Sequence, residues 1–267
     1  MERTDEQLHR LLSHIEELCD RAVRGQLTHT DFLTPREQKH AVAVLRRMGH
    51  AHRARLHGGY ASAERCCLLL FPDYALDACD EDADPPTLLA MAGEEDPVTA
   101  LHFRAGGYRT LSHRDYLGSL LSLGLERDVL GDIAMDGNDA TVLCLSRIAP
   151  FLLDNAERIG GDAVRVSETV LPPDFDGGRT FTPVHETVAS PRLDCIVAAL
   201  ANISREAAQN AVRDGLVEVD YEQELRPDHQ PDIPFTLTVR GKGKFIVRAL
   251  GDVTRKGRVR LLADRYV

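Results

Sequence analysis

Segments with strand and helix periodicity alternate between residues 98 and 169, and glycine-containing turns separate several of them. The periodicity predicts helices over 112–123 and 146–159, and strands over 98–104, 129–135, 141–145 and 163–169. Residues 136–139, Asp-Gly-Asn-Asp, have the chemistry of a hairpin turn between two of these strands. The resulting order is strand, helix, strand, strand, helix, strand.

This order is that of the ferredoxin-like fold. RNA-recognition modules share the topology with many unrelated domains, so topology alone decides little about function. The aromatic stacking pairs of a standard RNA-recognition motif are not visible here. We expect a further strand at 66–71 and assign residues 65–170 to this central domain. Residues 73–97 are an acidic insertion, expected to be a solvated segment with one short helix around 88–91, because 73–99 hold nine acids and no Lys or Arg.

Residues 1–64 are predicted to be a helical N-terminal region. One helix spans 4–25, and a second runs from Thr34-Pro35 to about Met48, with threonine as cap and proline at the first helical position. The first residues are polar and lack the apolar run of a signal peptide, and no segment is long enough to span a bilayer. We therefore expect a cytoplasmic protein with no membrane contact.

The C-terminal part is predicted to be a second small α+β domain, 187–267, after a linker at 171–186. Its expected helices are 193–200 and 205–213, the latter capped by Ser204. Its expected strands are 216–219, 235–240, 245–250 and 258–262. The fold class of the whole chain is therefore α+β: a helical N-terminal region, a ferredoxin/RRM-like central domain and this last domain.

Charge is distributed unevenly along the chain. The 267 residues have a net charge of −10, yet residues 238–267 hold nine Lys/Arg and two Asp. From Val188 onward the net charge is +2, and residues 1–187 carry −12. A local positive field on an acidic protein favours a polyanionic partner, so the binding face is expected to be C-terminal.

Two basic positions at helix starts and one basic turn are the candidate contacts. Arg205 lies beside the free N–H groups at the start of its helix, which suits an anion. Asp194 is expected to orient an arginine or cap its helix. The glycines of 240–244 let the backbone approach a ligand that the lysines flank. The predicted RNA-binding residues are Arg192, Asp194, Ser204, Arg205, Arg213, Arg240, Lys242, Lys244, Arg255, Lys256 and Arg258.

Metal and cofactor chemistry is not indicated by the sequence. The six cysteines have no Cys-x-x-Cys spacing and are expected to be buried thiols of a reducing compartment. The cluster of His50, His52 and His57 is interpreted as a basic helix end, because zinc ligands of short spacing are absent. We predict no catalytic residue, no metal and no cofactor.

Residues 190–219 resemble the small RNA-binding fold first described in ribosomal small-subunit protein four. The matching residues are Arg192-Leu193-Asp194, Ser204-Arg205 and Gly215-Leu216-Val217-Glu218-Val219-Asp220. The chain departs from the pattern at Asp220, where that family often has Asn.

The whole chain resembles the bacterial YlmH family. The matching segments are Pro35-Arg36-Glu37-Gln38, Gly58-Gly59-Tyr60, Ala63-Glu64-Arg65, the stretch 111–118, Leu123-Gly124-Leu125, Gly131-Asp132-Ile133 and the stretch 240–245. The resemblance implies a ribosome-associated protein whose members bind the large subunit with a peptidyl-tRNA on stalled complexes and assist C-terminal tailing in quality control; some are linked to cell division. It implies that the central domain, residues 65–170, binds RNA, as the C-terminal domain does. It implies large-subunit RNA and tRNA as partners, and we expect a monomer with no small-molecule substrate.

Two other functional classes remain open. An RNA-modifying enzyme, such as a pseudouridine synthase or a methyltransferase, would use the same C-terminal appendage and would need a catalytic acid or a Gly-rich loop. Asp115 is the best candidate acid, although its place in the first turn of a helix favours a structural role. A protein scaffold in which the basic tail pairs with the acidic insertion would show little salt-sensitive affinity for RNA.

Overall fold

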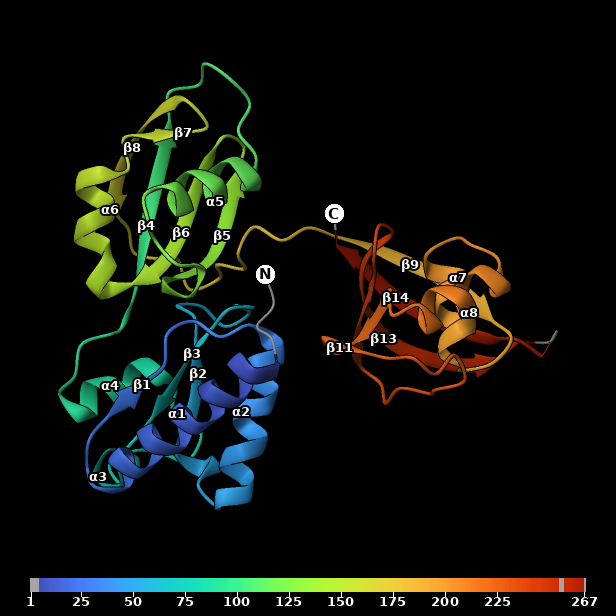
Figure 1. Cartoon of the computed structure of the whole chain (residues 1–267), viewed down its shortest axis with the longest axis horizontal. Coiled ribbons are helices and arrows are strands. Elements are labelled where there is room, and N and C mark those ends of the chain that lie inside the picture. Colours follow the sequence, from blue (N-terminus) through green and yellow to red (C-terminus); the bar gives the residue numbers. More distant parts are fainter. Residues whose placement is uncertain (1–4, 255–256, 267) are drawn as a thin grey trace. The chain divides into compact units, whose positions relative to one another are not determined.

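The computed structural model describes residues 5–254 and 257–266 of the chain. It divides into two compact units, residues 1–178 and 179–267, which are described separately (Figure 1). Both units combine helices with antiparallel sheets, so the predicted α+β class is confirmed.

The first part of unit 1 holds two helices, α1 (Asp5–Val23) and α2 (Pro35–Met48), and a three-stranded sheet in the order β1-β3-β2. The strands are β1 (Thr28–His29), β2 (Ala54–His57) and β3 (Cys67–Leu70), with a 3-10 turn at Ala51–Arg53. Thr34 and Glu37 form a capping box at the start of α2. The sheet corrects the predicted helical region 1–64. The strand assigned to the central domain is β3, and it pairs with β1 and β2 instead.

The acidic insertion is more ordered than its composition indicates. It contains α3 (Asp73–Leu76) and α4 (Pro85–Ala92), and the Asp84 side chain caps α4 by accepting the Thr87 N–H at 2.9 Å. Leu88 and Leu89 of α4 are buried in the hydrophobic core of unit 1. The expected solvated segment is therefore wrong for α4, because its two leucines give the helix an apolar side to bury.

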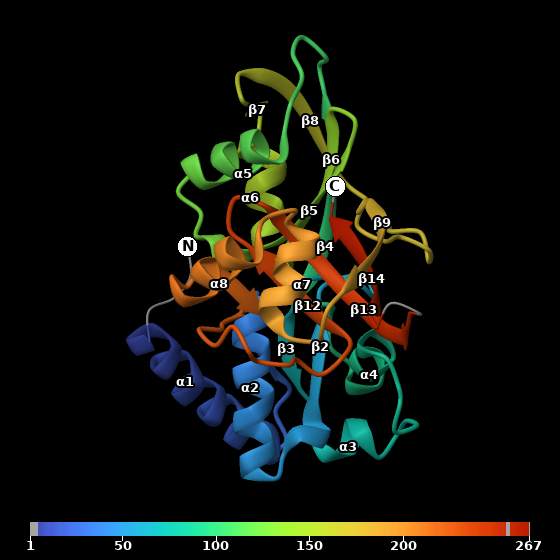
Figure 2. The ribbon, with the colours of Figure 1, turned by 90° about the vertical axis from the view of Figure 1, so that its right-hand side faces the viewer.

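The rest of unit 1 has the predicted ferredoxin-like topology. Its elements are β4 (Val98–Ala105), α5 (His113–Ser122), β5 (Leu130–Asp136), β6 (Asp139–Leu145), α6 (Ala149–Asn155), β7 (Arg158–Ile159) and β8 (Asp162–Glu168), with 3-10 turns at 127–129 and 146–148. The antiparallel sheet has the order β5-β6-β4-β8-β7. Helices α5 and α6 cover one face of it (Figures 1 and 2). The helix predicted over 146–159 is shorter than expected, and its last residue belongs to β7.

Sequence segments of the family pattern meet inside unit 1, where the first sheet adjoins the second. Asp132 of β5 accepts hydrogen bonds from the Tyr60 hydroxyl at 2.6 Å and from the backbone N–H groups of Glu64 and Arg65 at 2.8 and 3.1 Å. The Arg65 Nε in turn donates to the Leu130 carbonyl at 3.1 Å. The polar residues of these motifs therefore hold two parts of the unit together.

Unit 2 is a six-stranded sheet with two helices on one face. The helices are α7 (Leu193–Leu200) and α8 (Arg205–Arg213), as predicted. The strands are β9 (Phe181–Val188), β10 (Val217–Val219), β11 (Glu222–Gln223), β12 (Phe235–Val239), β13 (Gly243–Val253) and β14 (Val259–Tyr266), in the order β11-β10-β12-β13-β14-β9. Residues 181–186 of the expected linker are part of β9, which pairs with β14 along its whole length.

In the part of the chain that the structure describes, no helix is long and apolar enough to cross a membrane.

Candidate nucleic-acid interface

A buried carboxylate at the start of α7 organises the first group of predicted residues. Asp194 is fully buried, and its oxygens accept hydrogen bonds from Arg192 Nε and Nη2 at 3.1 and 3.2 Å. They also accept from Arg205 Nε at 3.3 Å and from Gln209 Nε2 at 2.8 Å. Two arginines that are 13 positions apart in the chain are thereby fixed side by side by one acid.

The environment of Asp194 keeps it charged. Burial alone raises the pKa of a carboxyl group, but the hydrogen bonds from Arg192, Gln209 and Arg205 outweigh burial and hold the pKa of Asp194 well below its usual range. The same contact raises the pKa of Arg192. Because Asp194 has no exposed surface, it cannot touch an external ligand, which corrects its place among the predicted contact residues. Its role is to position the two arginines.

The two arginines keep part of their hydrogen-bonding capacity for a ligand. The side chains of Arg192 and Arg205 are 35% and 54% exposed, whereas that of Asp194 is 0% exposed. Arg205 uses only its Nε on Asp194, so within the described residues both of its terminal nitrogens are available. Two guanidinium groups share one carboxylate, and the group therefore carries a net charge of +1.

The starts of α7 and α8 differ in what their backbone offers. The N–H groups of Leu193 and Asp194 donate to carbonyls of the 227–229 loop at 2.8 and 2.9 Å, so the start of α7 is closed to an anion. At α8, Ser204 accepts the Ala207 N–H at 3.1 Å and acts as the cap. Among the described residues the N–H groups of Arg205 and Glu206 have no partner, and they lie beside the Arg205 side chain.

A second group of predicted residues lies around the turn from β12 to β13. Arg240 and Lys242 are exposed, and their side chains make no hydrogen bond or ion pair within the described residues. The Arg240 N–H donates to the Leu216 carbonyl at 2.9 Å, which brings the turn to the residues that follow α8. Arg213, exposed in the last turn of α8, precedes Leu216 by three positions. A nine-residue helix is about 13 Å long, so α8 links this group to the first one over that length.

Lys244 lies on the other face of the sheet. Its neighbours Phe245 and Val247 are buried in the core beneath α7 and α8, and side chains alternate between faces along a strand. The Lys244 Nζ is 4.9 Å from the centre of the Tyr221 ring and 4.6 Å from that of Tyr266, a cation–π arrangement. The structure therefore does not bring Lys244 together with Arg192 and Arg205.

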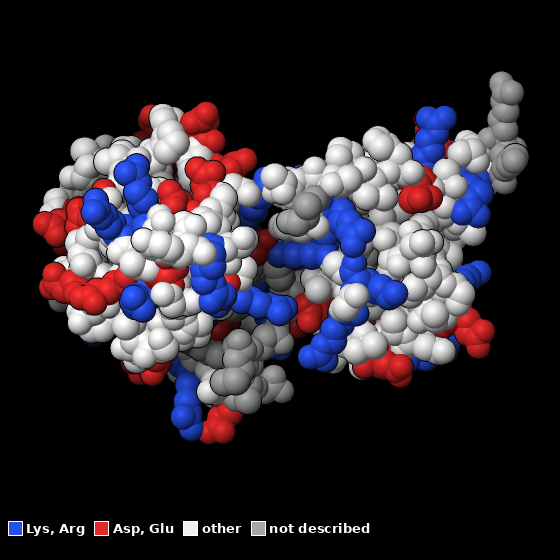
Figure 3. All heavy atoms as spheres, turned by 90° about the horizontal axis from the view of Figure 1, so that it is seen from above, with Lys and Arg blue, Asp and Glu red and all other residues white. Residues whose placement is uncertain are grey.

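Arg258, the last of the predicted residues, lies just before β14. The Arg258 guanidinium donates to the Thr187 hydroxyl at 2.9 Å and also to the Thr187 carbonyl, which ties it to the end of β9. Arg255 and Lys256 lie outside the described residues. In Figure 3, Lys and Arg side chains gather in a band on unit 2, on the right, with few acidic side chains among them.

Asp115, the acid considered for an enzyme, has a structural role. Its Oδ2 accepts hydrogen bonds from the Ser112 backbone N–H at 2.9 Å and from the Ser112 hydroxyl at 2.7 Å, and the two residues form the capping box of α5. The hydrogen bonds from Ser112 lower the pKa of Asp115. The structural role that its position in the first turn indicates is therefore confirmed. Within the described residues, no group of three His, Cys, Asp or Glu side chains is placed to hold a metal ion.

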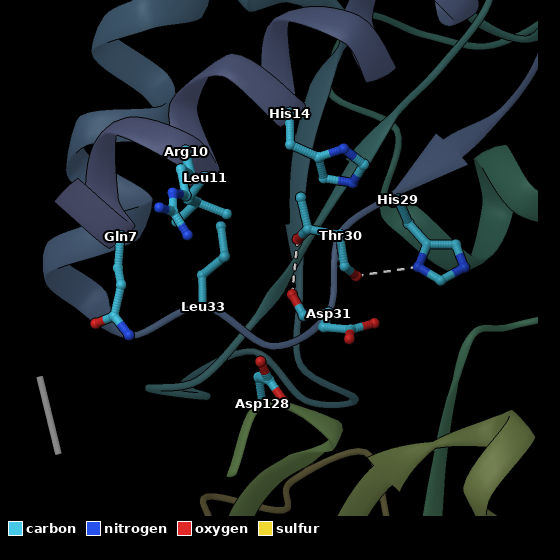
Figure 4. A pocket seen from close by; sticks show the side chains of 9 residues that line it. All are labelled: Gln7, Arg10, Leu11, His14, His29, Thr30, Asp31, Leu33 and Asp128. Atoms are coloured by element: carbon cyan, nitrogen blue, oxygen red, sulfur yellow. Dashed lines mark hydrogen bonds between the residues drawn. The ribbon is translucent and has the colours of Figure 1, made fainter. Parts of the chain in front are cut away.

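One cavity of unit 1 was not foreseen from the sequence. It has a volume of about 400 Å³, and Arg10 and His14 project into it from α1 while Asp31 and Asp128 lie below them (Figure 4). The Asp31 carboxylate also pairs with Arg147 at 2.7 Å. Its lining comes from separate segments of the chain, so no local pattern marks it. Because it mixes both charges, it favours no particular ligand charge.

Two family models and one relative agree with the resemblance seen in the sequence. A family model described as "YlmH, N-terminal" matches residues 7–75, and one described as "Putative RNA-binding domain in YlmH" matches residues 104–172. "Ribosome-associated protein quality control protein P2" of Bacillus subtilis (strain 168) is 29% identical over 240 residues, which cover 88% of this chain and 86% of that protein. The solved structure of "Cell division protein ylmH from Streptococcus pneumoniae" aligns with a TM-score of 0.48 and 19% identity, over 63% of this chain and 94% of that chain.

Proposed function

The chain belongs to the YlmH family, and from this premise we propose that it is a non-enzymatic protein that binds structured RNA on the ribosome. The proposed target is RNA of the large subunit together with tRNA, and the proposed role is in the rescue and quality control of stalled ribosomes in the cytoplasm. The name of the Bacillus subtilis relative supports the ribosomal part of this proposal. The arginine groups of unit 2 support the part concerning RNA.

One observation carries the proposal: a buried Asp194 holds Arg192 and Arg205 in a fixed, half-exposed pair. A buried carboxylate is costly unless it is paired, so it marks a place where side-chain orientation matters. Guanidinium groups bind phosphate in defined geometry, and their ordering entropy is already lost before RNA arrives. Arg205 adds the free N–H groups at the start of α8, so a phosphate can meet backbone and side-chain donors together.

The second basic group extends this contact. Arg240 and Lys242 project from the turn at the far end of α8, where no carboxylate pairs with them in the described chain. If Arg192, Arg205, Arg240 and Lys242 each neutralise one phosphate, log affinity falls with log salt with a slope of about −3 to −4. Such binding reads the shape and backbone of a folded RNA rather than its base sequence.

The test is co-sedimentation of the full chain with purified large ribosomal subunits, with and without bound peptidyl-tRNA, over a series of salt concentrations. The variant is Arg205→Gln with Lys242→Gln. The matched control is Arg226→Gln with Arg248→Gln, which removes two charges from unit 2 that pair with Glu224 and Asp264 of the protein itself.

We expect the variant to bind more weakly and to reduce the salt slope by roughly two, while the control stays close to wild type. Equal binding by the variant and the wild type at moderate salt would refute the proposal. Binding to large subunits that does not respond to peptidyl-tRNA would remove tRNA from the proposed target. A change in the mass of RNA fragments after incubation with the protein would favour the enzyme class instead.

A further inference from the structure

The central sheet of unit 1 has a face that is only half covered. Helices α5 and α6 lie on one face (Figures 1 and 2), where Leu101 and Phe103 are buried. On the opposite face, Val98 and Leu143 are covered by the first part of the unit, since a Cβ on Gly59 would lie 3.3 Å from Val98 and 2.8 Å from Leu143. The other half of that face, at the ends of β4 and β8 next to β7, is exposed.

Three arginines from three adjacent strands share this open half. Arg104 of β4 and Arg165 of β8 are direct cross-strand partners, and Arg158 of β7 pairs in register with Ala163, two residues before Arg165. Because side chains alternate along strands, all three lie on the face opposite Phe103 and Ile159, which are buried. All three are exposed.

These arginines lack acidic partners. Directly opposed side chains on one face have Cβ atoms about 4.5–5.5 Å apart, and like charges placed so repel each other. Within the described residues, none of the three makes a side-chain hydrogen bond or an ion pair. Asp139 lies beside β4, but its Oδ1 accepts the Ala105 N–H at 2.8 Å and its Oδ2 is 3.9 Å from the His102 ring. An anion between Arg104 and Arg165 would relieve their repulsion.

The loop that follows β4 presents an aromatic ring at the same end of the sheet. Tyr108 is 89% exposed, yet its backbone is held: Asp162, which is buried, accepts the N–H groups of Gly107 and Tyr108, both at 3.1 Å. The Gly106 N–H donates to the Ala163 carbonyl at 2.9 Å. An exposed ring on a backbone held in this way is available to stack on a ligand.

The chemistry of the two features is complementary. Arginines without carboxylate partners bind phosphates, and an exposed aromatic ring stacks on an unpaired base, the combination that single-stranded RNA requires. Both lie at the same end of the sheet, because Gly106 is bonded to β8 where Asp162 and Ala163 begin that strand. Figure 3 looks onto this end of unit 1, on the left, where basic and acidic side chains both appear among uncharged ones.

The family model described as RNA-binding spans residues 104–172, and we propose that this open half-face is where that domain binds RNA. At this site, separate from the one in unit 2, Arg104, Arg165 and Arg158 bind successive phosphates of an RNA strand and Tyr108 stacks on an unpaired base. The site deepens the proposed function and rests on it only for the identity of the ligand as RNA. It takes a strand with unpaired bases, whereas the helices of unit 2 meet a folded RNA.

The test measures binding of a fluorescently labelled oligouridine to the full chain by anisotropy over a series of salt concentrations. The first variant is Arg104→Gln with Arg165→Gln, and its matched control is Arg10→Gln with Arg47→Gln, which removes two exposed charges of unit 1 that pair with Glu6 and Glu16. The second variant is Tyr108→Ala, matched by Tyr74→Ala, which truncates a tyrosine that is 52% exposed in α3. Arg104→Lys with Arg165→Lys retains the charge and checks that a loss does not come from misfolding.

We expect the glutamine pair to reduce the salt slope by about 1.4 and the lysine pair to keep it, because the slope counts neutralised phosphates of a single strand. Tyr108→Ala is expected to weaken binding at least fivefold, the lower end for loss of one stacked base. The controls are expected to bind as the wild type does.

Unchanged oligouridine binding by both the glutamine pair and Tyr108→Ala would overturn the inference. A failure of the proposed unit 2 contact would not by itself give this result. If Arg205→Gln with Lys242→Gln abolishes sedimentation while the central variants have no effect, the second site is wrong and the proposed function holds. The opposite pattern removes the proposed function and keeps the site. Displacement of oligouridine by polyglutamate at equal charge concentration would show a site for acidic protein instead of RNA and would also refute it.

Discussion

Replacing Asp194 with asparagine tests whether RNA affinity depends on the orientation of Arg192 and Arg205 or on the net charge of the group. The substitution keeps the size of the side chain, removes one negative charge and turns one acceptor into a donor that faces the Arg192, Arg205 and Gln209 donors. If RNA affinity followed net charge alone, the variant would bind RNA more tightly. If the acid serves to position the arginines, the variant binds more weakly, because each side chain that must be ordered on binding costs about 0.5–1.5 kcal/mol. With two arginines released, this cost is at least about 1 kcal/mol, so we expect the dissociation constant for large subunits to rise at least about fivefold.

The same change destabilises unit 2. The carboxylate accepts four hydrogen bonds inside the protein, and bonds to a charged group contribute about 1.5–3 kcal/mol each when they are buried. Arg192 and Arg205 are partly exposed and regain water when the acid is lost, so most of their share is recovered. What remains is chiefly the Gln209 bond and the buried, poorly matched amide, which gives a loss of about 2–3 kcal/mol in the free energy of unfolding.

The pH dependence of this loss has a defined sign. An acid whose pKa is lower in the folded state than the usual value of about 3.9 stabilises the fold fully above that value, and its contribution disappears as the pH falls through the folded pKa. The difference between wild type and Asp194→Asn is therefore constant near neutral pH and shrinks below about pH 4.

Hydrogen exchange of peptides from α7 and α8, followed by mass spectrometry of the full chain in increasing urea, measures the free energy of opening of unit 2 directly. The matched control is Asp214→Asn, which changes an exposed aspartate at the end of α8. Tighter RNA binding by Asp194→Asn, or a free energy of opening no lower than that of the control, would refute the assigned role of Asp194.

Two further predictions concern packing and thiols. Gly131→Ala is expected to destabilise unit 1 by about 1–3 kcal/mol, because the new Cβ would lie 2.8 Å from the Phe32 ring. Gly118→Ala, inside α5 where a new Cβ meets no atom within 4 Å, is expected to stabilise the helix by about 0.5–1 kcal/mol. Hydrogen exchange of unit 1 peptides measures both changes. Cys144 is expected to resist iodoacetamide in the native chain at pH 8, because burial raises its pKa to about 12. The partly exposed Cys79 is expected to react first. Equal labelling of the two cysteines in the folded protein would contradict the packing described for β6.

The elements that could be predicted are those with local signals. Thr34 with Pro35 marks the start of α2, and Ser204 marks the start of α8, because a cap acts on N–H groups within three residues of itself. Strand β9 could not be found in this way. It is largely exposed and contains Pro183, and it is ordered by pairing with β14, more than 70 residues further along the chain. Strand β3 is recognised by its apolar run, but β1 has only two residues and β2 contains Arg55 and His57, so neither partner has such a run.

At the candidate site too, a local motif indicates which residues take part, but the sequence does not indicate the face of the sheet on which a residue lies. The motif Arg192-Leu193-Asp194 with Ser204-Arg205 indicated both arginines, and the structure shows why the acid accompanies them. Counting charges in a window could not assign faces, however. Lys244 is two residues from Lys242 in the sequence but lies on the side of the sheet away from the helices, because that face is fixed by Phe245 packing inward.

The net charge of residues 1–187 gives no indication of the arginine group on the central sheet. Residues 1–187 sum to −12, and nine of their acids fall between residues 73 and 99, in α3 and in the loops on either side of α4. Arg104, Arg158 and Arg165 are spread over 62 positions in that acidic part, so no window of the sequence makes them a cluster. Antiparallel pairing of β4 with β8, and of β8 with β7, places them on one face. Because a phosphate interacts with charges within about 8 Å at physiological salt, the face of the sheet determines whether it is bound, and the sum over the chain does not.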